Sequence, residues 1–226
     1  MDQARKKSTM TGARIQTDPA YERTRENNKE FATAGKAGKL LRDSVRSLVM
    51  KAKDGKLSNR LLKEMMKVIK ADATNPRGQR TVHDGAPGVL EGFDFNQNSP
   101  LNQSFHGAFT GIIDRATGKL TITIPAYVPT DAVIAPPSAT HYKLVAAGVQ
   151  VDFVAGKSFG EEKGSAILPV NSDPTAPLVI ETSVVAGATV PLFLFFGIQF
   201  YQDVNGHHYS LKSGEFNALC IVKVDA

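Results

Sequence analysis

Residues 192–196 of the chain read Leu-Phe-Leu-Phe-Phe, and this stretch constrains the fold more than any other. Side chains alternate between the two faces of a β-strand, so the three even-numbered residues share one face while Phe193 and Phe195 share the other. An antiparallel sandwich commonly leaves one face of each sheet in water, but here both faces are apolar. We therefore expect a further layer to cover this strand, either helices of the same chain or a neighbouring subunit.

The sequence around this strand has the pattern of antiparallel β-structure. In residues 120–124, leucine and isoleucine alternate with threonine, which is typical of a half-buried strand. Turn-forming residues at 114–118 and 203–206 lie between apolar runs and predict two hairpins. The charged residues 161–163 are predicted to form another hairpin tip. Because short strands and turns recur over residues 81–226, we expect an antiparallel β-sandwich or jelly roll there.

The first third of the chain has helical spacing instead. Residues 18–19, Asp-Pro, predict a helix start, because the carboxylate caps free N–H groups and proline lacks one of them. Apolar residues recur at steps of three and four along residues 41–52 and 61–69, which predicts two amphipathic helices joined by a short loop. Gly35 and Gly38 are expected to interrupt the helix that precedes them.

Charge divides the chain at nearly the same place as the change of period. Residues 1–80 carry 20 of the 27 lysines and arginines and 9 of the 22 acidic residues, a net charge of +11, and residues 81–226 have a net charge of −6. We therefore expect three regions: a polar basic arm at residues 1–17, a helical region at 18–80 and the β-sandwich. The predicted fold is α+β, with basic helices preceding an antiparallel sandwich.

The basic residues of the first two regions form a candidate interaction surface. They could neutralise the phosphates of nucleic acid, or they could form a solvated face or dock on the acidic β part. No aromatic residues are interleaved with them for base stacking, which favours the second interpretation. The candidate contact residues are Arg5, Lys6, Lys7, Arg14, Arg23, Arg25, Arg42, Arg46, Lys63 and Lys67, together with Phe193 and Phe195.

The sequence contains no pattern that predicts catalysis. His207 and His208 are adjacent, so in a strand they point to opposite faces and make a poor metal site. The other histidines are scattered, without cysteine or carboxylate partners at ligand spacing. Cys220 lies in an apolar run and is expected to be a buried thiol. Phosphate-loop, dinucleotide and nucleophile-elbow motifs do not occur, so we predict a non-enzymatic protein without metal, cofactor or small-molecule ligand.

Nothing in the sequence predicts membrane insertion or export. The longest apolar run, residues 190–198, is about half as long as a membrane-spanning helix. The N-terminus is polar and lacks the apolar stretch of a secretory signal. We expect a soluble protein with no signal peptide, and the sequence does not indicate its cellular location.

Residues 18–42 carry a block, Asp-Pro-Ala-Tyr-Glu-Arg-Thr-Arg-Glu-Asn at the start and Gly-Lys-Leu-Leu-Arg at the end, that resembles an uncharacterised family of bacterial proteins. Residues 71–80 are similar to a second block of that family, and the likeness extends over most of the chain. Its members have a longer segment than residues 1–12 before the first block. The resemblance implies helices followed by strands, but no activity and no functional residue.

These observations favour a structural protein that assembles with copies of itself. The basic arm of one subunit would dock on the acidic sandwich of the next, with Phe193 or Phe195 adding apolar contact. The alternative is a nucleic-acid-associated protein whose arm and helices contact phosphates. A basic arm followed by a jelly roll occurs in viral coat proteins, which is an analogy at the level of the fold alone.

Overall fold

The computed structural model describes residues 12–211 and 214–226 of the chain. Its helices are α1 (Gly12–Thr17), α2 (Glu22–Ser44), α3 (Arg46–Lys51), α4 (Leu57–Lys70), α5 (Leu101–Ser104) and α6 (Pro129–Ala132), with 3-10 turns η1 (Pro19–Tyr21) and η2 (Pro87–Leu90). Its strands are β1 (Thr110–Asp114), β2 (Lys119–Ile124), β3 (His141–Asp152), β4 (Lys157–Gly164), β5 (Leu168–Pro169), β6 (Leu178–Ser183), β7 (Leu192–Val204), β8 (His207–Ser210) and β9 (Ala218–Asp225).

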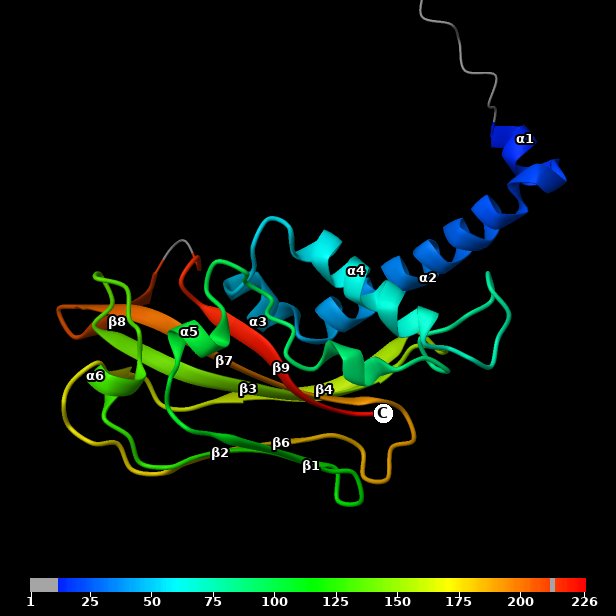
Figure 1. Ribbon diagram of the computed structural model, residues 1–226. Helices are drawn as coiled ribbons and strands as arrows, with labels where there is room; N and C mark the ends of the chain where they lie inside the picture. The colour runs from blue at the N-terminus through cyan, green and yellow to red at the C-terminus, as the bar shows by residue number, and fades with distance from the viewer. Residues whose placement is uncertain (1–11, 212–213) are drawn as a thin grey trace, which may run out of the picture.

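These elements form three layers (Figure 1). One outer layer is a three-stranded sheet with the order β1-β2-β6, and the middle layer is a six-stranded sheet in which β3 and β7 are central. Helices α2, α3 and α4 form the other outer layer. The strand pairings are antiparallel. The protein is therefore α+β and sandwich-like, with N-terminal helices followed by antiparallel sheets, as the sequence predicts.

Helix α2 continues through both of its glycines, so the predicted interruption is wrong. Gly35 has open space around it, whereas Gly38 is buried against α4, where an added β-carbon would lie 3.5 Å from Leu61 Cγ. The buried uncharged residues of α2 are Ala34, Ala37, Gly38 and Leu41. Gly38 thus lies at the contact between α2 and α4, where a β-carbon would make ordinary van der Waals contacts, and it does not end α2.

The next two predicted helices are present, with one change. A break at Val45, where φ is −127° and ψ is 37°, separates α2 from α3, so residues 41–52 do not form one helix. Helix α4 follows the prediction, because the apolar stripe of residues 61–69 is buried. The side chain of Val45 is fully buried, so the residue at the break is part of the hydrophobic core.

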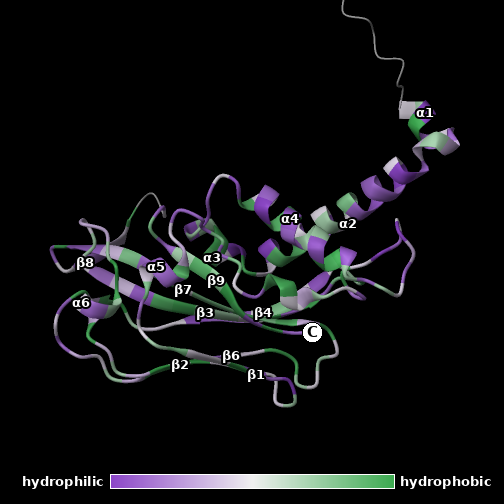
Figure 2. Cartoon of the chain, in the orientation of Figure 1, coloured by the Kyte–Doolittle hydropathy of each residue, from purple (hydrophilic) through white to green (hydrophobic). Residues whose placement is uncertain are grey.

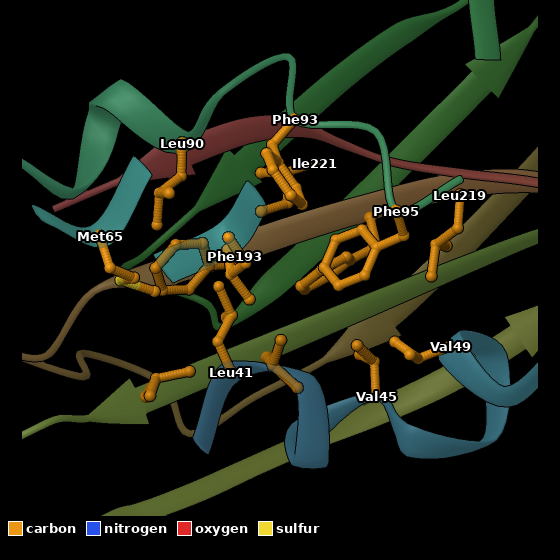
Figure 3. Close-up of a cluster of buried hydrophobic side chains, with 14 of the residues drawn as sticks. Leu41, Val45, Val49, Met65, Leu90, Phe93, Phe95, Phe193, Leu219 and Ile221 are labelled. Carbon is orange, nitrogen blue, oxygen red and sulfur yellow. The ribbon is translucent and has the colours of Figure 1, made fainter. Parts of the chain in front are cut away.

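The helices pack on the larger sheet through one apolar cluster, the helix–sheet core (Figure 3). Its members include Leu41, Val45, Val49 and Met65 from the helices, Leu90, Phe93 and Phe95 from the segment before β1, and Phe193, Phe195, Leu219 and Ile221 from the sheet. Phe193 and Phe195 are 0% exposed, and the rings of Phe95 and Phe195 lie 5.7 Å apart. Burying a phenylalanine contributes about 1.5–3 kcal/mol to stability.

The opposite face of β7 packs against the smaller sheet in a second cluster, the sheet–sheet core. Its largest contributors from β7 and β2 are Leu192, Leu194, Phe196, Ile198, Phe200, Leu120, Ile122 and Ile124. Strand β7 is therefore buried on both faces from residue 192 to residue 200. This confirms that a further layer covers the strand, and that layer consists of helices of the same chain.

Two of the three predicted turns are confirmed. The turn between β1 and β2 ends at Gly118, whose φ is +71° and where a β-carbon would lie 2.5 Å from Val184 O, so only glycine fits. Asn205 and Gly206, with φ of 54° and 81°, form the two-residue turn between β7 and β8. Residues 161–163 are not a hairpin tip, because they lie inside strand β4.

The change of charge near residue 80 does not separate two cores. The helix–sheet core contains residues from both sides of it. The segment before β1 also returns along β9, where Gly92 N–H donates to Ile221 O at 2.7 Å and Phe95 N–H donates to Leu219 O at 2.8 Å. The basic helical region and the acidic β region therefore fold against each other as one body.

Candidate interaction surface

Helix α1 and the first part of α2 extend away from the sheets (Figure 1), and we name residues 12–29 the N-terminal projection. None of these residues belongs to the helix–sheet core, whose first member in α2 is Ala34. The projection is mainly hydrophilic (Figure 2). At its base, Glu30 is buried and accepts the N–H of Gly78 at 2.8 Å, and Arg77 forms a 3.5 Å ion pair with Glu26. The loop after α4 thus supports the base of the projection.

Arg25 connects α1 to α2 within the projection. Its guanidinium donates to Ile15 O and to Asp18 O, both at 2.8 Å. The Asp18 carboxylate caps the turn that follows by accepting the N–H of Ala20 at 3.0 Å, and it forms a 3.2 Å ion pair with Arg14. Arg25 was predicted to contact a partner, but its guanidinium is engaged in holding the tip of the projection. Its role in this structure is structural.

Three of the predicted contact residues are exposed and paired about one helical turn away. The pairs are Arg23–Glu26 at 3.1 Å, Arg46–Asp43 at 3.6 Å and Lys67–Glu64 at 2.6 Å, with the basic side chains 75%, 74% and 55% exposed. Exposed pairs of this kind contribute about 0–1 kcal/mol each. Their cations can therefore exchange the intramolecular carboxylate for a partner at little cost. Lys63 is exposed as well.

Arg42 and Arg46 line a groove of about 540 Å³ beside α2, α3 and the start of α4, which we name the basic groove. Lys39 and Lys53 line it too, and so do two carboxylates, Asp43 and Asp54. Arg42 also donates to Gly38 O at 3.3 Å and to the Ser58 hydroxyl, so it links α2 to α4. Lys63 and Lys67 lie on α4 outside this groove. The cations predicted as one surface thus form separate patches.

The remaining predicted contact residues are two phenylalanines of β7 and three basic residues near the N-terminus. Phe193 and Phe195 are fully buried by the chain's own helices, so the prediction that they contact a second subunit is wrong for this fold. The sequence could not separate the two cases, because cover by a neighbour or by the same chain gives the same apolar pattern. Arg5, Lys6 and Lys7 lie outside the described residues.

Phe31, which is 53% exposed on α2, is not among the contact residues predicted from the sequence. It follows the buried Glu30 at the base of the projection. A signal for it is present in the sequence, since no other phenylalanine occurs in residues 1–80. An exposed aromatic ring at the junction between the projection and the body is the kind of residue that anchors protein interfaces.

A second groove, of about 790 Å³, lies beside α5 and β9 and has apolar lining residues such as Phe105 and Phe109. Asp94 and Cys220 also line it. Burial raises the pKa of Asp94 above its usual value. Burial, and secondarily the charge of Asp94, raises the pKa of the Cys220 thiol far above its usual value. A thiol that remains protonated is a poor nucleophile, so the groove presents an unreactive cysteine.

Among the described residues, His141, Asp203 and His208 form a group that could hold a metal ion. The prediction that the histidines other than His207 and His208 lack carboxylate partners is therefore wrong for His141. In the part of the chain that the structure describes, no helix is both long enough and apolar enough to span a membrane.

Comparison with known proteins adds little to this picture. No family model and no curated protein matches the chain. It is similar in part to a chain solved in work on the pH-induced modulation of Streptococcus parasanguinis adhesion by Fap1 fimbriae, with 15% identity, a TM-score of 0.21, and coverage of 45% of this chain and 70% of that chain. A likeness at this TM-score carries no argument. The resemblance of residues 18–42 to an uncharacterised bacterial family stays a prediction.

Proposed function

We propose that the protein is a non-enzymatic structural subunit that assembles with copies of itself, and that the N-terminal projection contacts the next copy. The observation that most supports this is the position of the projection: it is helical and held by Arg25, yet it joins neither hydrophobic core. Isolated helices shorter than about 12–15 residues are marginal in water, and α1 has 6 residues. A surface on another copy would supply the packing that the body does not.

Charge and exposed apolar area support the same proposal. Residues 1–80 carry a net charge of +11 and residues 81–226 a net charge of −6, so the basic N-terminal region as a whole, of which the projection is a part, would be attracted to the β region of another copy. Phe193 and Phe195 were predicted to make the apolar contact between subunits, but both are buried within the chain. Phe31 would make this contact instead, because it is the exposed ring beside the projection. An aromatic anchor within a charged rim is a common arrangement at interfaces.

The first test is the mass of the protein in solution, measured by size-exclusion chromatography with light scattering at low and high salt. We expect a mass well above the 24.3 kDa of one chain at low salt. The mass should fall as salt screens the attraction between the basic and acidic regions. A monomer at high protein concentration under both conditions would exclude the proposal.

Substitutions test which element makes the contact. Phe31→Ser, and the double change of Arg23→Glu with Lys29→Glu, should each shift the protein towards the monomer. Val179→Ser is the matched control, because Val179 is 64% exposed but lies on β6 in the opposite outer layer. Equal loss of assembly in Phe31→Ser and Val179→Ser would remove the projection from the proposal.

The basic groove favours a second candidate function, binding of nucleic acid through its phosphates. Four cations, Lys39, Arg42, Arg46 and Lys53, line one groove. Log affinity falls as log salt concentration rises, and each phosphate contact on duplex DNA adds about 0.9 to the steepness of that slope. In fluorescence anisotropy, a double change of Arg46→Ala with Lys53→Ala should weaken binding and lower that slope, whereas Lys67→Ala should have a smaller effect. No binding by the unmodified protein at low salt would exclude this candidate.

A further inference from the structure

His141, Asp203 and His208 come from three adjacent strands at one end of the larger sheet. The register pairs His141 of β3 with Tyr201 of β7, and it pairs Asp203 of β7 with His208 of β8. Residues two apart in a strand share a face, so Tyr201 and Asp203 bring their partners to the same side of the sheet. Two histidines and one carboxylate, from residues up to 67 positions apart, therefore meet on one face.

The ligand atoms of these side chains already converge. One ring nitrogen of each histidine and one carboxylate oxygen of Asp203 all lie within 4.8 Å of one another. His208 Nε2 is 3.5 Å from Asp203 Oδ2, and the two imidazole centroids are 4.4 Å apart. In a tetrahedral zinc site with bonds of about 2.1 Å, neighbouring ligand atoms are about 3.4 Å apart. The His208–Asp203 pair has this spacing, and the ligand nitrogen of His141 lies within 4.8 Å of both partners.

Neighbouring groups hold the ligands in suitable orientations. Thr140 Oγ1 accepts the N–H of Asp203 at 2.7 Å and lies 2.9 Å from His141 Nδ1, which leaves His141 Nε2 as the ligand nitrogen. Gly206 N–H donates to Asp203 Oδ1 at 2.9 Å, so Oδ2 is the oxygen that faces His208. Metal-binding histidines commonly bond through their second nitrogen to an oxygen acceptor. The turn and Thr140 supply this outer set of contacts.

We propose that His141, Asp203 and His208 bind a divalent transition-metal ion of the Zn²⁺ type. Two imidazoles and one carboxylate form a ligand set that Zn²⁺ accepts, and three protein ligands leave a fourth position for water. Ca²⁺ and Mg²⁺ prefer oxygen ligands and do not match two ring nitrogens. The competing explanation is a surface ion pair between a protonated His208 and Asp203 with a neighbouring ring.

The full chain, without a histidine tag and after treatment with a chelator, tests this proposal. Isothermal titration calorimetry with Zn²⁺ should show one site per chain. Co²⁺ should give the visible absorption of a four- or five-coordinate nitrogen and oxygen site, and added Zn²⁺ should displace it. Mg²⁺ should not compete. If the unmodified chain binds neither Zn²⁺ nor Co²⁺, the group is an ion pair and the proposal is wrong.

Substitutions separate this group from the other surface histidines. His141→Ala and His208→Ala should each lower Zn²⁺ affinity at least about tenfold, because even changes in the outer contacts of a metal site cost about 10–100-fold. His207→Ala is the matched control, since His207 is adjacent, exposed and directed to the other face of β8. Asp203→Asn removes the charge of the carboxylate but keeps the size of the side chain and the turn. It should also lower the affinity for Zn²⁺. Equal loss of affinity in His207→Ala and His208→Ala would overturn the proposal.

Discussion

Strand β7 and the N-terminal projection are the two extremes of burial in this protein. Each residue from 192 to 200 is buried, and β7 contributes to two cores at once. In residues 12–29 no side chain is buried, and the segment is held by ion pairs, a capping carboxylate and Arg25. The difference teaches that the stability of the fold resides in the body. The projection is then free to exchange its surroundings without unfolding the rest.

The largest effect should come from removing a ring from β7. We expect Phe195→Ala to lower the free energy of unfolding by about 3–5 kcal/mol, because it leaves a cavity in the helix–sheet core. Phe31→Ala, on the exposed side of α2, should change it by about 0.5 kcal/mol or less. Urea unfolding followed by circular dichroism measures both. A cost below about 1 kcal/mol for Phe195→Ala would show that the helices do not cover β7 as described.

A smaller effect should come from the loop that connects the body to the base of the projection. The Asp72 carboxylate accepts N–H groups of Thr74, Asn75 and Thr81, at 2.8, 3.0 and 2.9 Å. Burial alone would raise the pKa of Asp72, but these hydrogen bonds and one from the Asn75 side chain outweigh it, and the pKa lies far below its usual value. We expect Asp72→Asn to be less stable than the unmodified protein at neutral pH.

The pH dependence of this effect has a definite sign. A lowered carboxylate pKa adds stability that is complete above the unfolded-state value of about 3.9 and is lost as pH falls through the folded-state value. Asp72→Asn should therefore lose less stability than the unmodified protein between about pH 5 and pH 2. Urea unfolding at a series of pH values checks this. Parallel curves for the two proteins would contradict the assignment.

A gain in stability is expected at the exposed glycine of α2. Gly35 has no neighbouring atom within 4 Å of an added β-carbon, and alanine is favoured over glycine inside a helix by about 0.5–1 kcal/mol. We expect Gly35→Ala to raise the free energy of unfolding by up to this amount. Gly118→Ala is the contrasting variant, because its β-carbon would clash with Val184 O, and it should lower stability. A loss of stability in Gly35→Ala would indicate a contact at that face.

The smallest effect on overall stability should come from Arg25. Arg25→Ala removes the hydrogen bonds to Ile15 O and Asp18 O, so amide hydrogen exchange in α1 should become faster. The global free energy of unfolding should change by about 0.5 kcal/mol or less. Arg23→Ala is the control and should leave exchange in α1 unchanged. Global destabilisation in Arg25→Ala would mean that the projection unfolds together with the body.

The strand with two apolar faces could be predicted from the sequence. Successive side chains of a strand point to opposite faces, so apolar residues at both odd and even positions require that both faces of the strand be covered. The helix α4 and the two confirmed hairpins could be predicted for similar local reasons. The position of Gly38 could not, because the sequence does not distinguish a glycine buried at a helix crossing from a glycine at a helix end. The prediction of a hairpin tip at residues 161–163 was wrong for a related reason, because charged residues are common both in turns and in edge strands.

Two of the three residues of the proposed metal site could have been derived from the sequence. A two-residue turn at Asn205 and Gly206 places Asp203 directly opposite His208. His141 could not be found in this way, because its place depends on β3 pairing with β7, and nothing local specifies which strands become neighbours. The hydrogen bonds that Arg25 donates at the tip of the projection could not be predicted either. Their acceptors are backbone carbonyls, which the sequence does not distinguish from one another.

Cys220 is the single cysteine of the chain, and it is buried with its thiol protonated. Thiol-specific dyes and spin labels react with the thiolate, so this native residue should remain almost unlabelled near neutral pH. A cysteine introduced by Lys36→Cys, at an exposed position of α2, would then be the fast-reacting position of the molecule. The protein thus allows a single probe to report from α2 on distances between subunits, with no need to remove the cysteine it already has.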